Sequence, residues 1–367
     1  MSHAWRPGLS AIVSHGNGNG GGRNSRSRSR RHEKNIPQCL VQSTTEIRRK
    51  FLELENRQYD RLHHGLHNPN DTRWKIEDTL VVRARNRYVN ISPWQSNRIH
   101  LKVPDERSDY INASPIVLKS RKDGTVKRYI ATQGPKEGHF SHIWRMIWQE
   151  TNDVAVVVML TKTTELGRPK CSQYFPEDDG ETWEIKDQGE FNDSFHATVS
   201  LLEKKKDLRS ACTVRKLSMT VGDKSKIVWH LLFKGWPDYN VPEGDDKSAL
   251  LELIKFANEK NTGPENPLIV HCSAGVGRSG TFITLDHFIR DIDAGAISPT
   301  ERADVVFDTV NELREQRMYM VQSEVQFQFL YTVLRERFLR RSKSSSPPST
   351  QSSTHAELKE EESHHSA

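Results

Sequence analysis

One run of residues combines a cysteine, several glycines and an arginine at a spacing that favours chemistry on an anion. Residues 268–270 predict the end of a buried strand, Cys272 opens a glycine-containing loop, and the loop ends on Arg278 where a helical pattern begins. The backbone N–H groups of such a loop and the positive end of the following helix favour a bound anion. The planar guanidinium of Arg278 can hold two oxygens of one phosphate. We expect the residues between them to line this site: Ser273, Ala274, Gly275, Val276 and Gly277.

The thiol of Cys272 lies at the base of the same predicted loop. The helix dipole, the loop N–H groups and Arg278 all favour a thiolate, so we expect its pKa to lie below that of a free thiol. A thiolate beside a bound phosphate is a nucleophile aimed at phosphorus. The alternative is a buried core cysteine beside an ordinary loop. It does not account for an apolar strand followed by a cysteine, five residues, an arginine and a serine.

The stretch Val270–Gly280 resembles the signature loop of the tyrosine-specific protein phosphatases, cysteine-dependent enzymes that hydrolyse phosphotyrosine. The resemblance covers nearly the whole region that we expect to be folded. It implies that Cys272 is the nucleophile and that Arg278 binds the phosphate. It also implies that His271 orients the loop without acting as a base, and that Ser279 helps the thiolate leave when the cysteinyl-phosphate breaks down.

A second chemical element is the segment Lys234–Pro242, which follows an apolar strand pattern over 227–233. Its prolines and glycine predict a loop that is stiff in the middle and able to swing at its ends, as a lid does. Phenolate leaves a phosphate ester slowly unless its oxygen is protonated. We therefore expect Asp238 to be the general acid of the first step and the general base of the second. Trp236 is expected to anchor the hinge and to lie among the substrate-binding residues.

The turn-rich stretch Asn86–Trp94 carries the aromatic residue Tyr88. The resemblance implies that this loop walls the active-site cleft and that Tyr88 packs against the phosphotyrosine ring. A deep pocket selects tyrosine, because the side chains of phosphoserine and phosphothreonine are too short to reach its base. From the residues alone, Tyr88 is an ordinary half-buried loop aromatic. Asn90 stands where the family usually has an aspartate that binds the substrate backbone, and asparagine keeps an acceptor but loses the charge.

Four further residues receive a role from the resemblance alone. Glu165 is expected to pair with Arg278 and fix its guanidinium. Lys170 is expected to meet the segment Lys234–Pro242, the acid loop, when that loop is closed. Without the resemblance, two surface charges are the simpler interpretation. Gln322 is expected to position the hydrolytic water, and Gln326 to support it near the start of a helix.

The composition favours a large folded domain that needs neither disulfides nor metals. The chain has 367 residues, 34% of them hydrophobic and 28% charged, which suffices for a substantial core. The four cysteines are scattered without a CxxC pair: Cys39, Cys171, Cys212 and Cys272. We therefore expect free thiols in a reducing compartment, no metal site and no cofactor. The pairs His63–His64 and His364–His365 lack a fitting ligand set around the predicted cleft.

Both ends of the chain have compositions that cannot build a core. We expect residues 1–40 to form a disordered tail rich in Arg, Ser and Gly, residues 41–340 to form the catalytic domain, and residues 341–367 to form a disordered polar tail. The Arg-Ser run over 23–31 leaves a nuclear address, an RNA contact and a solvated tail open. The net charge of +6 is modest and argues against a nucleic-acid enzyme. No apolar run or signal pattern indicates membrane contact, so we expect a cytoplasmic location, with a nuclear one left open.

The folded region predicts one α/β domain. A helical pattern begins near residues 43–45, where Ser43, Thr44 and Thr45 are all candidate caps. Residues 154–160 form a valine-rich run that predicts a strand buried on both faces. We expect a twisted, mostly parallel central sheet flanked by helices, with the cysteine loop at the C-terminal end of a strand.

The predicted function is hydrolysis of phosphotyrosine in proteins through a cysteinyl-phosphate, in intracellular signalling. The partners would be phosphotyrosyl proteins, with MAP kinases as candidates by family analogy, and the oligomeric state stays open. One alternative is a dual-specificity phosphatase, against which the Tyr88 loop and the Trp236–Asp238 lid argue. The other is a non-catalytic phosphotyrosine-binding module. Such a module usually lacks the acid, the cysteine or the arginine, and here all three are present.

Overall fold

The computed structural model describes residues 36–68, 70–187, 189–237 and 240–344. Most of both predicted tails lies outside these residues, and so does Asp238, the predicted general acid. The predicted division of the chain into a tail, a catalytic domain and a second tail therefore stays a prediction.

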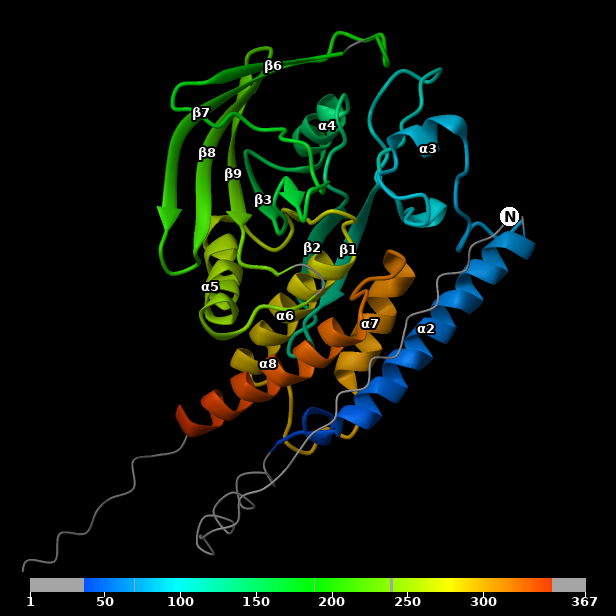
Figure 1. The fold of residues 1–367 in the computed structure, drawn as a ribbon, viewed down its shortest axis with the longest axis vertical. Helices are drawn as coiled ribbons and strands as arrows, with labels where there is room; N and C mark the ends of the chain where they lie inside the picture. The colour runs from blue at the N-terminus through cyan, green and yellow to red at the C-terminus, as the bar shows by residue number, and fades with distance from the viewer. Residues whose placement is uncertain (1–35, 69, 188, 238–239, 345–367) are drawn as a thin grey trace, which may run out of the picture.

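One large sheet flanked by helices dominates the fold (Figure 1). The helices are η1 (Gln38–Val41), α2 (Thr44–His67), α3 (Leu80–Arg85), η2 (Gln95–Asn97), α4 (Phe140–Glu150), α5 (Gly244–Lys260), α6 (Gly277–Ala294), α7 (Val305–Gln316) and α8 (Glu324–Ser344). The strands are β1 (Ala113–Lys119), β2 (Val126–Thr132), β3 (Val154–Met159), β4 (Thr164–Glu165), β5 (Arg168–Pro169), β6 (Thr182–Lys186), β7 (His196–Asp207), β8 (Cys212–Val221), β9 (Lys224–Phe233) and β10 (Leu268–His271).

The sheet is mixed, with strand order β1-β2-β10-β3-β9-β8-β7-β6. β2, β10, β3 and β9 are parallel neighbours at its centre. The outer pairs are antiparallel. The predicted α/β class is confirmed, but the expectation of a mostly parallel sheet holds only for this centre. Gly222 and Asp223 alone connect β8 to β9, and so short a connection permits only antiparallel pairing.

β3 explains why the centre of the sheet is apolar on both faces. Val156 and Val158 belong to the core on the side of α2, α5, α6, α7 and α8. Ala155, Val157 and Met159 belong to the opposite core, which α4 covers. Side chains along a strand alternate between the two faces, so a strand covered on both sides must be apolar throughout. The valine-rich strand predicted here is confirmed, and β10 beside it is likewise buried along its whole length.

The first long helix, α2, begins at Thr44, so Ser43 is the cap among the three candidates that the sequence offers. The hydroxyl of Ser43 caps it by accepting a hydrogen bond from the N–H of Glu46 at 3.2 Å. Ile47, Phe51 and Leu54 lie on one buried face of α2 and pack into the core with α7 and α8. This docking brings the helix alongside the C-terminal half of the domain (Figure 1).

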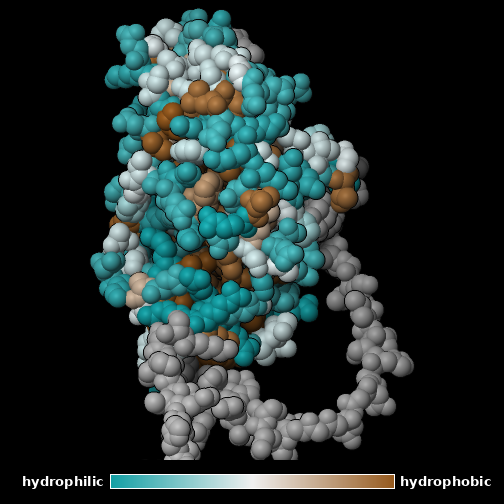
Figure 2. All heavy atoms as spheres, turned by 90° about the vertical axis from the view of Figure 1, so that its left-hand side faces the viewer, coloured by the Kyte–Doolittle hydropathy of each residue, from teal (hydrophilic) through white to brown (hydrophobic). Residues whose placement is uncertain are grey.

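On the face seen in Figure 2, hydrophobic residues form small patches among hydrophilic ones. In the described part of the chain, no helix is both long enough and apolar enough to cross a membrane. The four cysteines are buried and form no disulfide, so the expectation of free thiols is confirmed.

Candidate active site

Cys272 follows the C-terminal end of the central strand β10. This strand pairs in parallel with β2 on one side and with β3 on the other, so its end lies near the middle of the sheet edge. Ligands bind at this edge in open α/β sheets. Cys272 is 5% exposed, and α6 begins at Gly277. The predicted order of strand, loop and helix is confirmed.

Gly275 allows the loop to turn this tightly. Its φ is +72°, and a Cβ there would lie 2.1 Å from the backbone oxygen of Thr132 on β2. The N–H of Gly275 donates a hydrogen bond to Sγ of Cys272 at 3.3 Å. Val276 supplies no side-chain cap to α6, so the first N–H groups of this helix face the loop without a capping oxygen. Such a helix start favours a bound anion.

The surroundings of Cys272 favour its thiolate. Burial by itself raises the pKa of the thiol, but the hydroxyl of Ser279, the charge of Arg278 and two backbone N–H groups outweigh burial and lower the pKa below its ordinary value. Ser279 is buried, and its Oγ makes no hydrogen bond of good geometry to the described atoms. A buried hydroxyl in this position can donate a hydrogen bond to the thiolate.

The guanidinium of Arg278 is oriented by a carboxylate. Nη1 and Nη2 of Arg278 donate to the two oxygens of Glu165 at 2.7 and 2.8 Å, and Nη1 also donates to the backbone oxygen of Leu160 at 3.0 Å. Glu165 also accepts from the hydroxyl of Thr161 at 3.0 Å and the N–H of Lys162 at 3.2 Å. Burial raises the pKa of Glu165, but Arg278 and these donors hold it below its usual value. This ion pair sets the orientation of the Arg278 guanidinium group.

Cys272 opens into a cavity of about 620 Å³ that gathers residues from distant parts of the chain. The predicted site residues that line it are Tyr88, Asn90, Glu165, Lys170, Cys272, Ser273, Ala274, Gly277, Arg278, Gln322 and Gln326. The hydroxyl of Tyr88 lies 2.8 Å from Oγ of Ser273, which donates to the backbone oxygen of Lys170 at 2.8 Å. These two contacts connect the Tyr88 loop and the segment after β5 to the signature loop.

Gln322 and Gln326 lie over the start of α6. A Cβ built on Gly277 would lie 3.0 Å from the side-chain amide of Gln326 and 3.3 Å from Cβ of Gln322. Oε1 of Gln326 accepts from the N–H groups of Gln322 and Ser323 at 3.0 and 3.3 Å. The hydroxyl of Ser323 accepts in turn from the N–H of Gln326 at 3.2 Å, which completes a reciprocal cap on α8. Gln326 thus supports the backbone that presents Gln322.

Comparison with known proteins identifies the family. A family model described as protein-tyrosine phosphatase matches residues 82–336. Tyrosine-protein phosphatase 1 of Saccharomyces cerevisiae is 35% identical over 328 residues, which cover 80% of this chain and 95% of the yeast protein. The chain belongs to the protein-tyrosine phosphatase family. It is thereby a hydrolase that acts on phosphotyrosine.

Solved structures agree with this assignment. The catalytic domain of human protein tyrosine phosphatase non-receptor type 18 (PTPN18) aligns with a TM-score of 0.64 and 28% identity, covering 80% of this chain and 96% of that one. PTPN18 in complex with HER2 phosphopeptides aligns with a TM-score of 0.66 and 26% identity, covering 86% and 99% of the two chains.

Trp236 of this protein-tyrosine phosphatase does not line the cavity, against its predicted place among the substrate-binding residues. Its ring packs into the core and is 3% exposed. Its Nε1 donates to the backbone oxygen of Asn240 at 3.0 Å. This hydrogen bond joins the residues on either side of the part of the acid loop that the structure does not describe. Asp238 lies between these two residues, in that part, while Asn240 lines the cavity. The indole is in a position to anchor the loop and is too deep to meet a substrate.

His271 of the phosphatase lies beneath the signature loop. Its Nδ1 lies 3.1 Å from the backbone oxygen of Cys272, and its Nε2 lies 2.7 Å from the hydroxyl of Tyr174. Burial lowers the pKa of His271 to about 4, so the ring is neutral near pH 7. Tyr174, whose hydroxyl also lies 3.0 Å from His230, is absent from the sequence prediction. No local pattern distinguishes it from an ordinary core tyrosine.

Arg317 is the second residue that sequence reasoning missed. It is fully buried, and its guanidinium donates to the backbone oxygens of Gly275 at 2.9 Å and Ala274 at 3.1 Å. It also donates to Oδ1 of Asn112 at 2.7 Å and to Oγ of Ser114 at 3.2 Å. These bonds hold the carbonyl side of the signature loop against β1. An arginine directly after an amphipathic helical pattern is typical of an exposed helix end, so the sequence carries no signal for this role.

One group of described side chains has the ligand atoms that a metal ion would need. These atoms, from His139, His142 and Glu190, lie within 4.8 Å of one another. Glu190 is already engaged, because its carboxylate lies 2.7 Å from both His142 and Arg85. The group does not line the cavity that contains Cys272.

Proposed function

We propose that this chain hydrolyses phosphotyrosine in proteins in two steps, through a cysteinyl-phosphate on Cys272. One observation carries the proposal: a thiol with a lowered pKa and an arginine oriented by a carboxylate meet in one cavity at the start of a helix. A thiolate nucleophile, a fixed guanidinium and an uncapped helix start together suit phosphoryl transfer.

In the first step, Sγ of Cys272 attacks phosphorus. The S–P bond forms while the bond between phosphorus and the tyrosyl oxygen breaks. The loop N–H groups and Arg278 stabilise the charge on the equatorial oxygens. Asp238 gives its proton to the departing tyrosyl oxygen. Its role rests on its place in the acid loop, whose residue Asn240 lines the same cavity.

In the second step, a water held by Gln322 attacks the phosphorus of the cysteinyl-phosphate. Asp238, now a carboxylate, takes a proton from this water. The O–P bond forms and the S–P bond breaks, which releases inorganic phosphate and restores the thiolate. The hydroxyl of Ser279 stabilises the leaving thiolate by donating a hydrogen bond to it, and this agrees with its lowering of the Cys272 pKa.

Tyr88 supports selectivity for phosphotyrosine. Its hydroxyl contacts Ser273 and it lines the same cavity as Cys272, so a bound aromatic ring has a flat partner along one wall. A phosphothreonine side chain is too short to span this wall and still present its phosphorus to Cys272. Asn90 lines the same wall and offers a neutral acceptor to the substrate backbone.

The nature of the physiological substrate rests on similarity. PTPN18 is known in complex with HER2 phosphopeptides, which supports phosphotyrosyl peptides as the substrate class of this chain. A role in intracellular signalling, MAP kinases as substrates, and a cytoplasmic or nuclear location stay predictions.

The decisive experiment measures phosphate release from matched phosphotyrosyl and phosphothreonyl peptides. The wild-type chain should act on the tyrosyl peptide without added metal. Cys272→Ser should abolish release, and Asp238→Ala should slow it by about 10²–10⁴-fold, as expected for the loss of a general acid. Equal turnover of both peptides would instead indicate a dual-specificity phosphatase. Tight binding without turnover would indicate a phosphotyrosine-binding module.

A further inference from the structure

The loop that carries Gln322 holds two residues in backbone conformations that favour glycine. It joins α7 to α8, and Tyr319 and Val321 both have a φ of +58°. Residues with a Cβ seldom adopt this left-handed conformation, and for a β-branched residue such as valine it is especially unfavourable. Bonds from the surrounding structure must therefore keep the loop in this shape.

Arg314 of α7 supplies two of these bonds. Its side chain is fully buried, and its Nε and Nη2 donate to the backbone oxygens of Met320 at 3.0 Å and Val321 at 2.9 Å. Its remaining nitrogen, Nη1, donates to the carboxylate of Glu55 at 2.8 Å. A buried arginine needs such a counter-charge, so Glu55 helps to keep Arg314 in the position from which it holds the loop.

Gln58 supplies a third bond, from the same helix as Glu55. Its Oε1 accepts a hydrogen bond from the N–H of Tyr319 at 3.0 Å, and the residue is only 1% exposed. The bond lies on the strained residue itself. Both Glu55 and Gln58 belong to α2, which precedes residues 82–336, the part of the chain that the family model matches.

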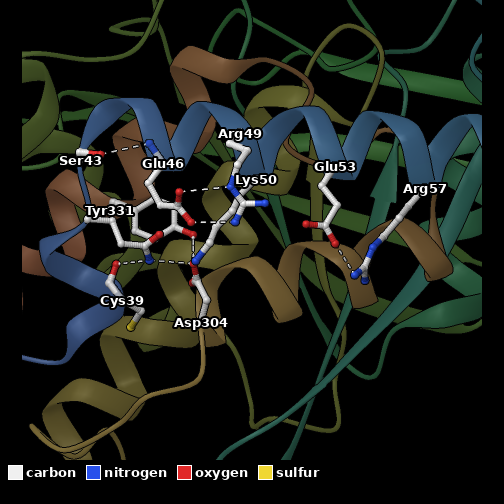
Figure 3. A network of polar contacts seen from close by, with 10 residues as sticks. Cys39, Ser43, Glu46, Arg49, Lys50, Glu53, Arg57, Asp304 and Tyr331 are labelled. Atoms are coloured by element: carbon white, nitrogen blue, oxygen red, sulfur yellow. Dashed lines mark hydrogen bonds and ion pairs between the residues drawn. The ribbon is translucent and has the colours of Figure 1, made fainter.

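The remainder of α2 is anchored to the two helices that flank the loop (Figure 3). Asp304, the N-cap of α7, accepts hydrogen bonds from Lys50 of α2 at 2.6 Å and from the hydroxyl of Tyr331 of α8 at 2.9 Å. Further along α2, Arg61 donates to Oδ1 of Asn311 on α7 at 2.5 Å. The helix is thus held against α7 on both sides of Gln58, and Asp304 links this contact to α8.

We propose that α2 sets the position of Gln322, with Gln58 and Arg314 as positioning residues for the second step of the reaction. This inference rests on the proposed function, which assigns the hydrolytic water to Gln322. Arg314 donates to the backbone oxygen of Val321, the residue directly before Gln322. Gln58 accepts from the N–H of Tyr319, three residues before Gln322. When either bond is lost, Tyr319 and Val321 relax toward ordinary φ values and carry Gln322 away from the water.

The effect should fall on one chemical step. Attack by Cys272 and departure of the tyrosyl oxygen need the signature loop and the acid loop, which α2 does not contact in these interactions. Hydrolysis of the cysteinyl-phosphate needs a positioned water. Weakening the α2 contact should therefore slow the second step while the first stays near its wild-type rate, so that cysteinyl-phosphate accumulates.

The test is a stopped-flow measurement of 4-nitrophenolate release from 4-nitrophenyl phosphate. Gln58→Leu removes the acceptor for Tyr319. We expect its steady-state rate to fall about tenfold, the scale of one lost hydrogen bond, and an initial burst of 4-nitrophenolate to appear. Gln58→Glu keeps an acceptor oxygen at the same reach but buries a carboxyl group at a site that is 1% exposed, so its burst should be smaller than that of Gln58→Leu. Glu53→Ala, which breaks a surface pair with Arg57 on α2 away from the loop, should show no burst.

Two further variants separate the possible failures. Gln322→Ala is the reference and should show the burst by itself. If it does and the folded Gln58→Leu variant does not, the positioning role of α2 is wrong while the proposed function stands. If Gln322→Ala shows no burst, the assignment of the water to Gln322 is wrong, and this inference is wrong with it. Glu55→Ala changes a partly exposed partner of Arg314 and should repeat the burst if Gln58→Leu fails to fold.

Discussion

The loop that carries Cys272 and the loop that carries Gln322 meet at one cavity, but they keep their shapes in different ways. The signature loop turns at Gly275, where a left-handed φ carries little cost. The loop between α7 and α8 that carries Gln322, the glutamine loop, makes its left-handed turns at Tyr319 and Val321, where the cost is larger. Its shape depends on side chains from α7 and α2.

This difference predicts different sensitivities. A loop whose turn is made by glycine should respond mainly to changes within itself and in the groups it touches directly. A loop whose turns are made by residues with side chains stores strain, so it relaxes when a hydrogen bond from another helix is removed. The first step of catalysis should therefore be robust to changes in α2, and the second step should not.

The largest effect should come from the signature loop. Arg278→Lys removes the bidentate contacts with phosphate and with Glu165, since an ammonium group acts only as a point charge. We expect phosphate release to fall by about 10²–10³-fold, the scale of losing one donor to the charged transition state. Arg168→Lys, the same substitution on the cavity rim, is the matched control and should change the rate little. Comparable losses in the two variants would contradict a special role for Arg278.

Gly275→Ala tests whether the signature loop depends on close packing in addition to its φ. The new Cβ would lie 2.1 Å from the backbone oxygen of Thr132, so the loop must shift. A shift of about 1 Å between reacting groups costs about 10²-fold in rate. Gly124→Ala is matched in φ, at +73°, but meets no atom within 4 Å. It should lower the midpoint of thermal unfolding slightly and leave the rate of phosphate release unchanged. Equal rates in the two variants would show that contact with β2 is unimportant.

Gly280→Ala acts where the two loops touch. Its Cβ would lie 2.5 Å from the backbone nitrogen of Val321, which donates to the backbone oxygen of Val276 at 3.1 Å. We expect hydrolysis of the cysteinyl-phosphate to slow about tenfold as this hydrogen bond is lost, with a burst of 4-nitrophenolate. The amplitude of the burst is an internal control, because it reports an intact first step. A slower first step would mean that the glutamine loop and the signature loop move together.

The smallest effect should be a shift in pH dependence. Only the thiolate reacts with iodoacetamide, so alkylation of Cys272 should rise with pH to half its maximum at the pKa, which lies below that of an ordinary thiol. Ser279→Ala removes a contribution that lowers this pKa, so the midpoint should move to higher pH. Burial raises the pKa of Cys171 to about 12, and that of Cys39 and Cys212 to about 11, so these thiols should react slowly. An unmoved midpoint would contradict the role of Ser279.

The fold was predictable where a pattern reports directly on burial. The valine-rich run predicted β3 because a strand covered on both faces must be apolar throughout. The antiparallel outer strands were not predicted. The direction of a strand relative to its neighbour depends on the length of the connection between them and cannot be read from the pattern of one strand. Trp236 was misplaced for a related reason: a tryptophan beside a lid can face the cleft or the core, and only packing decides between them.

By itself, the sequence determined the chemistry of the signature loop. The strand, Cys272, the glycine turn and the start of α6 are covalent neighbours, so the backbone brings thiol and N–H groups together without help from the rest of the chain. Only the tertiary structure decided which groups support this loop. Glu165 meets Arg278 from 113 residues away, Arg317 reaches the carbonyls of Gly275 and Ala274, and α2 contacts the loop before Gln322. Such contacts arise from how helices and strands pack. The residues next to a side chain in the sequence therefore do not predict which distant groups it will contact.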